Sequence, residues 1–275
     1  MKIIENVIEI GLEKPFEILH ASDTHVALAD ERDDQRKLDL AKQRFQYFDY
    51  AMDNVKFMSA YAQENNLTIV HTGDFMDFVS EKNLDAVRDF VHNNDVFFAA
   101  GNHEFSLYVG EAFEDEAYRN ISLDKVQSAF TNDIRFSVRE IGGVNFVAID
   151  NSYYLFEQSQ LDGLKEVAKQ GKPIVLLMHN PIYTKDFFEY KIKNYPDAAF
   201  LNGVPHELMT GYAKDRYVQQ KADDVTFATC DYIKNEPLIK AILCGHLHED
   251  YVDTIHDGLK QYVTHITSLR RIKFI

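Results

Sequence analysis

Five short apolar runs in this sequence are each followed closely by Asp, Asn or His. The runs have the length and composition of β-strands, and they are Phe16–His20, Leu67–His71, Val96–Ala100, Ile174–Met178 and Ile239–Cys244. The segments after them are Asp23-Thr24-His25, Gly73-Asp74-Phe75-Met76-Asp77, Gly101-Asn102-His103-Glu104, His179-Asn180-Pro181 and Gly245-His246-Leu247-His248. Because ligands of open α/β sheets bind at the carboxyl ends of strands, the pattern predicts one site assembled from several strand ends.

The rest of the chain indicates a layered α/β protein. Three further strands are predicted at Arg135–Val138, Val144–Ile149 and Gln261–Ile266, with a hairpin turn at Gly142-Gly143. Apolar residues at helical spacing predict one long helix with a single buried face: Ala41, Phe45, Phe48, Met52, Val55 and Ala62. A second helix is predicted over Ser159–Gln170. We expect a mixed sheet or two packed sheets, in a single domain over residues 1–275.

The balance of charge restricts the partners of the chain. Its 275 residues include 29 basic and 44 acidic side chains, which give a formal net charge of −15. This charge repels polyanions, so nucleic acid and membranes are not expected as partners, but a small phosphoester could still bind at one locally cationic site. Arg270, Arg271 and Lys273 are expected to be solvated charges. The oligomeric state is left open.

Two features favour a cytoplasmic location. The cysteines, Cys230 and Cys244, form no CxxC motif and no disulfide framework. Glu5, Glu9 and Glu13 interrupt the N-terminal stretch where the apolar part of an export signal would lie. The apolar runs are all far shorter than the roughly 18 residues needed to cross a bilayer.

The residue types at the strand ends indicate metal ions. Asp, His and Asn without cysteine suit Mn²⁺, Fe, Zn²⁺ or Co²⁺, and the set is too rich in nitrogen for a dedicated Ca²⁺ site. The candidates are too many for one ion, but two ions sharing a bridging carboxylate would use them. Two metals about 3.5–4 Å apart are the usual arrangement for phosphoester hydrolysis.

Taken in order, the motifs Asp-x-His, Gly-Asp-x-x-Asp, Gly-Asn-His-Glu, a His before x-Pro, and Gly-His-x-His resemble those of the calcineurin-like metallophosphoesterases. They run from Asp23 to His248, so the resemblance spans most of the chain. It implies a metal-dependent phosphoric ester hydrolase with a two-sheet sandwich of mixed strands flanked by helices (α/β/β/α). The long helix before Asp74 and the stretch between Pro181 and Ile239 lie outside it.

The resemblance implies two divalent or trivalent metal ions, with Mn, Fe or Zn expected first, and seven ligands. These are Asp23, His25 and His248 for one ion, Asn102, His179 and His246 for the other, and Asp74 as the bridge between them. Asp77 and Glu104 would orient the ligands through hydrogen bonds. The alternative for each of these two acids is a helix cap or a surface charge.

The resemblance also implies catalytic roles for His103, Asp74 and Asn102. A hydroxide bridging the two metals would attack phosphorus in line, while the cations and the Asn102 amide stabilise the phosphoryl oxygens. His103, which would not be a ligand, would protonate the leaving alkoxide or stabilise the transferring group. The sequence therefore predicts hydrolysis of a small phosphomonoester or phosphodiester.

Two other functions stay open from the sequence. A metal-dependent nuclease can use the same scaffold, and some relatives of the fold are non-catalytic protein-binding platforms. The acidic composition disfavours the nuclease, and the complete set of ligand positions disfavours the platform. Phe78-Val79 follows Asp77 where protein Ser/Thr phosphatases have Arg-Gly, which argues against that group.

The segment at about 182–236 is an insertion between two ligand motifs, so both its ends are expected near the site. Its aromatic residues include Tyr183, Phe187, Phe188, Tyr190, Tyr195, Tyr212 and Tyr217. They either contribute to a cap over the substrate or pack as a small separate core.

Overall fold

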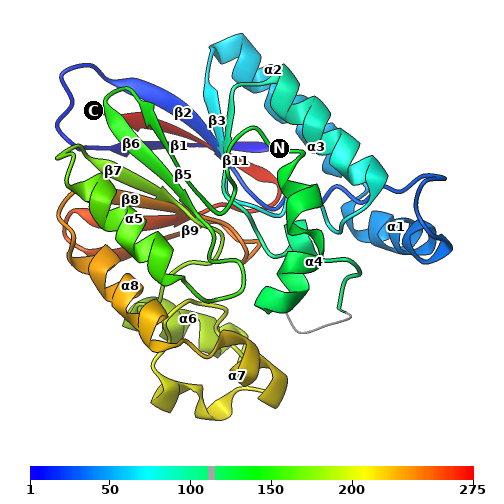
Figure 1. The fold of residues 1–275 in the computed structure, drawn as a ribbon. Helices are drawn as coiled ribbons and strands as arrows, with labels where there is room; N and C mark the ends of the chain where they lie inside the picture. Colours follow the sequence, from blue (N-terminus) through cyan, green and yellow to red (C-terminus); the bar gives the residue numbers. More distant parts are fainter. Residues whose placement is uncertain (111–114) are drawn as a thin grey trace.

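A computed structural model describes residues 1–110 and 115–275. Two sheets pack face to face, with helices over their outer faces (Figure 1). The first sheet has the order β1 (Lys2–Ile8), β11 (Ser268–Phe274), β2 (Phe16–Ala21), β3 (Thr68–His71) and β4 (Val96–Phe98). The second has the order β5 (Phe136–Ile141), β6 (Val144–Ile149), β7 (Ile174–Leu177), β8 (Ile239–Cys244), β10 (Leu259–Val263) and β9 (Tyr251–His256). The predicted two-sheet sandwich is confirmed.

Both sheets are mixed, and their parallel strands set the position of the site. β2, β3 and β4 are parallel in the first sheet, as are β6, β7, β8 and β10 in the second. The predicted turn at Gly142-Gly143 joins the antiparallel strands β5 and β6. Parallel neighbours end at the same edge of a sheet. The motifs after β2, β3 and β4 therefore share one edge, and those after β7 and β8 share another.

The central core lies between the sheets and uses alternate residues of each strand. In β6, Phe146 and Ala148 face the other sheet, whereas Val147 and Ile149 face the helices on the outer side. All six residues of β6 are buried. This two-sided burial is why the strand is almost entirely apolar in the sequence, with Asn145 as its one polar residue.

Helices cover both outer faces. α2 (Ala51–Asn65), α3 (Glu81–Asn93) and α4 (Glu116–Gln127) pack on the first sheet, and α5 (Gln158–Ala168) and α8 (Asp224–Asn235) pack on the second. α3 begins where the Ser80 hydroxyl accepts a hydrogen bond from Asn83 N. α5 lies within two residues of the predicted helix at each end. No helix in the described part of the chain is both long and apolar enough to cross a membrane.

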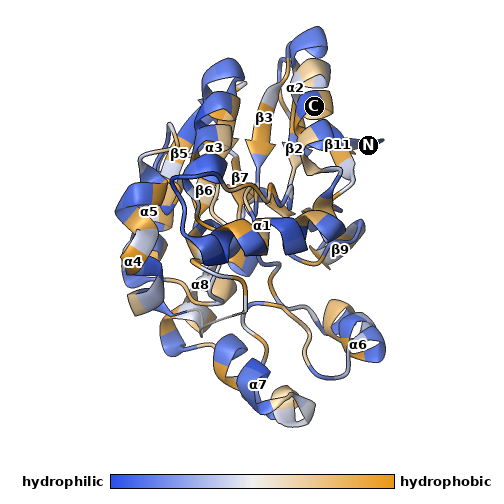
Figure 2. Cartoon of the chain, turned by 90° about the vertical axis from the view of Figure 1, so that its right-hand side faces the viewer, coloured by the Kyte–Doolittle hydropathy of each residue, from blue (hydrophilic) through white to orange (hydrophobic). Residues whose placement is uncertain are grey.

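The prediction of one long helix before Asp74 is wrong. The structure has two helices, α1 (Gln35–Phe48) and α2, separated at Asp49 and Tyr50. α1 contains no buried residue, and Phe45 is 54% exposed. Its apolar stripe has no sheet beneath it, because α1 lies to one side of the sandwich (Figure 1) and is largely hydrophilic along its length (Figure 2).

The C-terminal region also differs from expectation. The strands β1, β9 and β11 are not anticipated by the sequence pattern. The expectation that Arg270 is solvated is wrong, since the residue is buried in β11. Its guanidinium donates hydrogen bonds to Val263 O, Thr264 Oγ1 and Asn6 Oδ1. These acceptors compensate for the loss of water around the buried guanidinium.

The insertion contains α6 (Lys185–Asn194), the 3₁₀ helix η2 (His206–Gly211), α7 (Lys214–Gln220) and α8. α6 and α7 lie beyond the second sheet, at the bottom of Figures 1 and 2. Several of its aromatic residues extend the outer core of the second sheet rather than forming a separate one: Tyr183, Phe187, Phe188, Tyr212 and Tyr217.

Candidate metal centre

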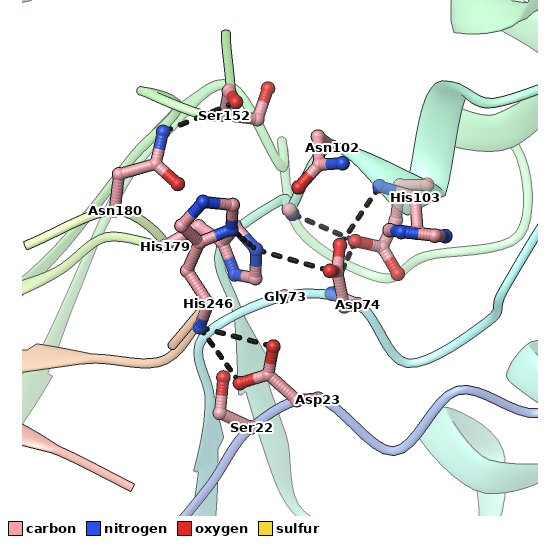
Figure 3. A network of polar contacts seen from close by, with 12 residues as sticks. Ser22, Asp23, Gly73, Asp74, Asn102, His103, Ser152, His179, Asn180 and His246 are labelled. Carbon is pink, nitrogen blue, oxygen red and sulfur yellow. Dashed lines mark hydrogen bonds and ion pairs between the residues drawn. The ribbon is translucent and has the colours of Figure 1, made fainter. Parts of the chain in front are cut away.

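The side chains predicted at the strand ends lie close together in the structure. Figure 3 shows those of Asp23, Asp74, Asn102, His103, His179 and His246. Two groups could each hold a metal ion, with ligand atoms in each lying within 4.8 Å of one another. The first half of the centre comprises Asp23, His25 and His248, and the second half comprises Asp74, His179 and His246. A third possible group, His25, Asp74 and His103, connects the halves. Asn102 lies beside them at the end of β4 (Figure 3).

The backbone at these ligands is unusual. Asp23, His25, Asp74, His246 and His248 all have positive φ, between 49° and 70°. In the described residues only three other non-glycine residues do so, and two of these, Tyr154 and Phe200, pack against His246. Such conformations cost of order 1 kcal/mol or more each and persist where the surrounding structure enforces them. Strain is thus concentrated at the candidate site.

The glycines of the motifs allow the loops to approach closely. A Cβ added at Gly101 would collide with the Asp74 carboxylate, and one added at Gly245 would collide with Ser22 and Asp23. Glycine is required at both positions because no side chain fits between the loops and the carboxylates.

The first half is oriented by charged side chains. His25 Nδ1 lies 2.8 Å from Asp77 Oδ1, and its Nε2 faces inward, 2.9 Å from His248 Nε2. Asp77 is fully buried and accepts hydrogen bonds from Arg44 Nε at 2.5 Å and from a terminal Arg44 nitrogen at 2.9 Å. Phe48 stacks on the His25 ring with centroids 4.6 Å apart. Arg44 and Phe48 both belong to α1.

The second half is oriented by different groups. His179 Nδ1 donates to the Thr72 main-chain carbonyl at 2.7 Å, and its Nε2 lies 3.1 Å from Asp74 Oδ2. His246 Nδ1 lies 3.2 Å from His179 Nε2, and His246 Nε2 lies 2.5 Å from the Tyr154 hydroxyl. The other ring nitrogen of each histidine is therefore fixed by a hydrogen bond.

Asp74 and the neighbouring loops are held by buried hydrogen bonds. Asp74 Oδ1 accepts from His103 N at 2.8 Å. Glu104 is fully buried and accepts from the amides of Asp74, Phe75 and Gly101 at 2.7 Å each. Burial and the nearby Asp74 carboxylate raise the pKa of Glu104 to about 8. Asp77 and Glu104 are therefore neither helix caps nor surface charges.

His103 lies between the ligands and solvent. Its Nδ1 donates to the Asp77 carbonyl at 2.7 Å and lies 3.3 Å from the Asp77 carboxylate. Its ring meets the His25 ring edge to face, with centroids 4.7 Å apart. Because Nδ1 is committed to a carbonyl oxygen, Nε2 is the nitrogen that can exchange a proton with a ligand.

The donor set fits metal cations. The hydrogen bonds to Asp77 and Thr72 place a proton on Nδ1 of His25 and of His179, so that each neutral ring presents the Nε2 lone pair to the centre. Together with the buried carboxylates of Asp23 and Asp74, this forms a cluster of acceptors that needs positive charge. Nitrogen and oxygen donors of this kind suit Mn, Fe or Zn ions.

The pKa values of Asp74 and His179 also indicate that the centre favours bound positive charge. Burial would raise the pKa of Asp74, but His179 and His103 outweigh it and hold that pKa well below its usual range. Burial would lower the pKa of His179, but Asp74 and Asp23 outweigh it and raise it to about 10. The centre therefore binds either protons or metal cations strongly.

A pocket of about 550 Å³ opens over the centre. Asn102, His103 and His246 line it on the side of the centre. The loop after β4 also lines it, as do Phe200, Asp215, Arg216 and Gln219 of the insertion. The insertion thus borders the pocket, but with none of the seven aromatic residues expected from the sequence.

Several residues of the site are missed by the sequence pattern. Arg44, Phe48, Tyr154 and Phe200 follow no motif, and the contribution of Thr72 is a main-chain carbonyl. The one available signal was the predicted helical stripe before the Asp74 motif, which includes Phe48 but not Arg44.

Comparison with known proteins identifies the family. A model of the calcineurin-like phosphoesterases matches residues 16–250. No curated protein matches the sequence. A solved dimetal phosphatase from Danio rerio is 13% identical, with a TM-score of 0.52, and the match covers 91% of this chain and 87% of that chain. A 5′-nucleotidase from Candida albicans is 13% identical, with a TM-score of 0.44, over 91% of this chain and 46% of that chain. The chain belongs to the calcineurin-like phosphoesterase family and is a metal-dependent phosphoric ester hydrolase.

Proposed function

We propose that this protein hydrolyses a small phosphomonoester or phosphodiester at a dinuclear metal centre. The observation that carries the proposal is the cluster of carboxylate and imidazole acceptors beside a pocket that His246, His103 and Asn102 line. Phosphoester hydrolysis needs positive charge for the phosphoryl oxygens and a proton for the leaving group. The cluster and His103 would meet these two needs.

The first half would hold one ion through Asp23, His25 and His248. The second half would hold the other through His179 and His246 with Asn102, and Asp74 would bridge. When bound, Mn, Fe or Zn ions would supply Lewis acidity toward the phosphoryl oxygens and lower the pKa of water. Asp77 and the Thr72 carbonyl would keep the Nε2 atoms of His25 and His179 available as ligands.

His103 is the proposed proton donor. With Nδ1 bonded to the Asp77 carbonyl, a proton on Nε2 makes the ring an imidazolium, and the Asp77 carboxylate 3.3 Å from Nδ1 stabilises that charge. Nε2 would pass its proton to the leaving alkoxide, and the neutral ring would regain a proton from solvent. The Asn102 amide nitrogen would donate to a phosphoryl oxygen.

The pocket favours a small substrate over nucleic acid. Its volume lies within the range of sites for small molecules, which is about 300–1,000 Å³. A nuclease needs several cations along the path of the phosphate backbone. The described lining has Arg216 as its one arginine or lysine and Asp215 as its one carboxylate, which supports the small-molecule reading.

The direct test is turnover by protein reconstituted separately with Mn, Fe and Zn. p-Nitrophenyl phosphate and bis(p-nitrophenyl) phosphate report on monoester and diester hydrolysis. We expect metal-dependent turnover of at least one, lost by at least about 100-fold in Asp74→Asn because the shared carboxylate is removed. Absence of turnover on both with every metal would reject the proposal.

The role of His103 is tested by varying the leaving group. His103→Gln should lose much more activity on an alkyl phosphate than on the p-nitrophenyl ester that corresponds to it. The nitrophenolate needs no proton to leave, whereas an alkoxide does. Equal losses on both esters would show that His103 does not act as the acid.

A further inference from the structure

The pocket carries a cation that the motifs do not account for. Arg216 on α7 lines the same pocket as His103, together with Phe200. Its guanidinium carbon lies 5.4 Å from the centroid of the Phe200 ring. The Phe200 ring lies 6.0 Å from the ring of His246, a candidate metal ligand. Two ring contacts therefore connect Arg216 to the centre.

Within the described residues, no carboxylate forms an ion pair with Arg216. Most arginines of this acidic protein form ion pairs: Arg32, Arg44, Arg88, Arg119, Arg135, Arg139, Arg270 and Arg271. Arg216 forms none with any residue at 1–110 or 115–275, and it donates to the neutral Gln219 Oε1 at 2.9 Å. Asp215 also lines the pocket, but it is exposed to solvent, whereas Arg216 is half-buried.

The support beneath Arg216 is preorganised. Phe200 has a φ of 59°, a conformation that non-glycine residues rarely adopt. Its amide donates at 3.0 Å to the side-chain oxygen of Gln220, which is fully buried. A residue held in this way keeps its ring in place before a ligand arrives, so less entropy is lost on binding.

We propose that Arg216, supported by Phe200, binds a second anionic group on the leaving group of the substrate. The substrate would then be a phosphoester whose alcohol carries a carboxylate or a second phosphate at its far end. Either group accepts the paired hydrogen bonds that a guanidinium offers. A stacked aromatic leaving group is disfavoured, because Arg216 already covers one face of Phe200 and the ring also contacts His246.

This inference rests on the proposed function and narrows its substrate. Water supplies the oxygen of the new bond to phosphorus, and the phosphorus–oxygen bond to the leaving group breaks. The products are an alcohol that retains its anionic group and either inorganic phosphate, from a monoester, or a phosphomonoester, from a diester. Arg216 would act through affinity and orientation of the leaving group, not through the chemical step.

The test compares three alkyl phosphates with the same four-carbon spacer. They are 4-hydroxybutyl phosphate, butane-1,4-diol bisphosphate and 4-(phosphonooxy)butanoate, which end in a neutral group, a phosphate and a carboxylate. In the wild-type protein we expect kcat/KM to be about 10- to 100-fold higher for at least one anionic substrate, as for a charge-assisted hydrogen bond. The preferred anion identifies the class of leaving group.

The variants assign the preference to Arg216. In Arg216→Gln the ratio of anionic to neutral kcat/KM should fall toward one, and Arg216→Lys should keep part of it because it retains the charge without the planar fork. Lys214→Gln, which removes the same charge from an exposed position on α7, should keep the wild-type ratio. Binding of 4-phosphonobutanoate, measured by calorimetry, should weaken in Arg216→Gln but not in Lys214→Gln.

Failure of this inference differs from failure of the proposed function. Turnover of p-nitrophenyl phosphate with no preference for anionic alkyl phosphates, or with a preference that Arg216→Gln retains, would overturn the subsite and leave the hydrolase standing. Absence of metal-dependent turnover on every ester would reject both.

Discussion

The two halves of the centre are built from similar ligands but are supported in different ways. In the first half, the ring of His25 is oriented by the carboxylate of Asp77, which Arg44 holds from helix α1. In the second half, the ring of His179 is oriented by the main-chain carbonyl of Thr72 at the end of β3. The ring of His25 therefore depends on side chains, including one from a helix that has no buried residue, whereas the ring of His179 depends on the main chain next to the sheet.

This difference predicts unequal sensitivity to mutation. A carboxylate behind a ligating histidine raises its basicity and can be removed by one substitution. A main-chain carbonyl cannot be removed without disturbing the strand. We expect the first half to lose metal affinity through single substitutions that leave the second half intact.

The largest effect is expected from Asp77→Asn. The neutral amide would no longer favour the Nδ1 proton of His25, so metal affinity at the first half should fall about 10- to 100-fold. Metal content after dialysis at graded metal concentrations should show one ion lost well before the other. Equal loss of both ions would mean that the halves are not independently supported.

The second-largest effect is expected on stability and concerns His71, which contacts the loop that carries Asp23 and His25 and the loop that carries Asp74. Its Nε2 contacts Thr24 Oγ1 at 2.9 Å, and its Nδ1 accepts from Gly73 N at 3.3 Å. Burial lowers the pKa of His71 to about 3. In the unfolded chain the pKa of this histidine is about 6.5, so the unfolded state takes up the proton first as pH falls. The free energy of unfolding therefore decreases from about pH 6.5 down to about pH 3.

At pH 5.5 the loss attributable to His71 is about 1.4 kcal/mol, or tenfold in the unfolding equilibrium. It is measured as the change in the free energy of urea unfolding between pH 7.5 and 5.5, in the presence of a chelator. His71→Gln should show a smaller change than wild type, and His92→Gln, at an exposed position, should match wild type. An unchanged dependence in His71→Gln would contradict the prediction.

A smaller effect is expected from Arg44→Gln. Arg44 fixes Asp77 with two hydrogen bonds but is 21% exposed along its side chain, so we expect about a fivefold loss of metal affinity at the first half. Arg44→Lys should lose less metal affinity than Arg44→Gln. Lys42→Gln, at an exposed position on the same helix, should leave the metal affinity unchanged. If Lys42→Gln matched Arg44→Gln, general helix charge would be the cause rather than the contact with Asp77.

The smallest effect is expected from Tyr154→Phe in the second half. The variant removes the hydroxyl that lies 2.5 Å from His246 Nε2 but leaves the Thr72 and Asp74 contacts of His179 in place. We expect roughly a two- to threefold loss of metal affinity at the second half. A larger loss of metal affinity than in Asp77→Asn would show that the second half, not the first, is the more sensitive to substitution.

The sequence by itself determined a layered α/β architecture with candidate ligands at the strand ends, and its motifs, through their resemblance to a family, implied the two-sheet sandwich. Both rest on local patterns: two-sided burial makes β7 a continuous apolar run and β6 nearly one, and each motif follows its strand within a few residues. Parallel strands then bring the motifs to common edges without further information.

Only the tertiary structure decided how the ligands are supported and what faces the substrate. Helical spacing predicts an apolar stripe on α1 but not whether a sheet lies beneath it, and here none does. The contacts of Arg44 with Asp77 and of Arg216 with Phe200 join segments far apart in the chain or on different elements. Such pairings depend on where helices dock, which is decided by packing across the whole molecule and leaves no periodic trace in the sequence.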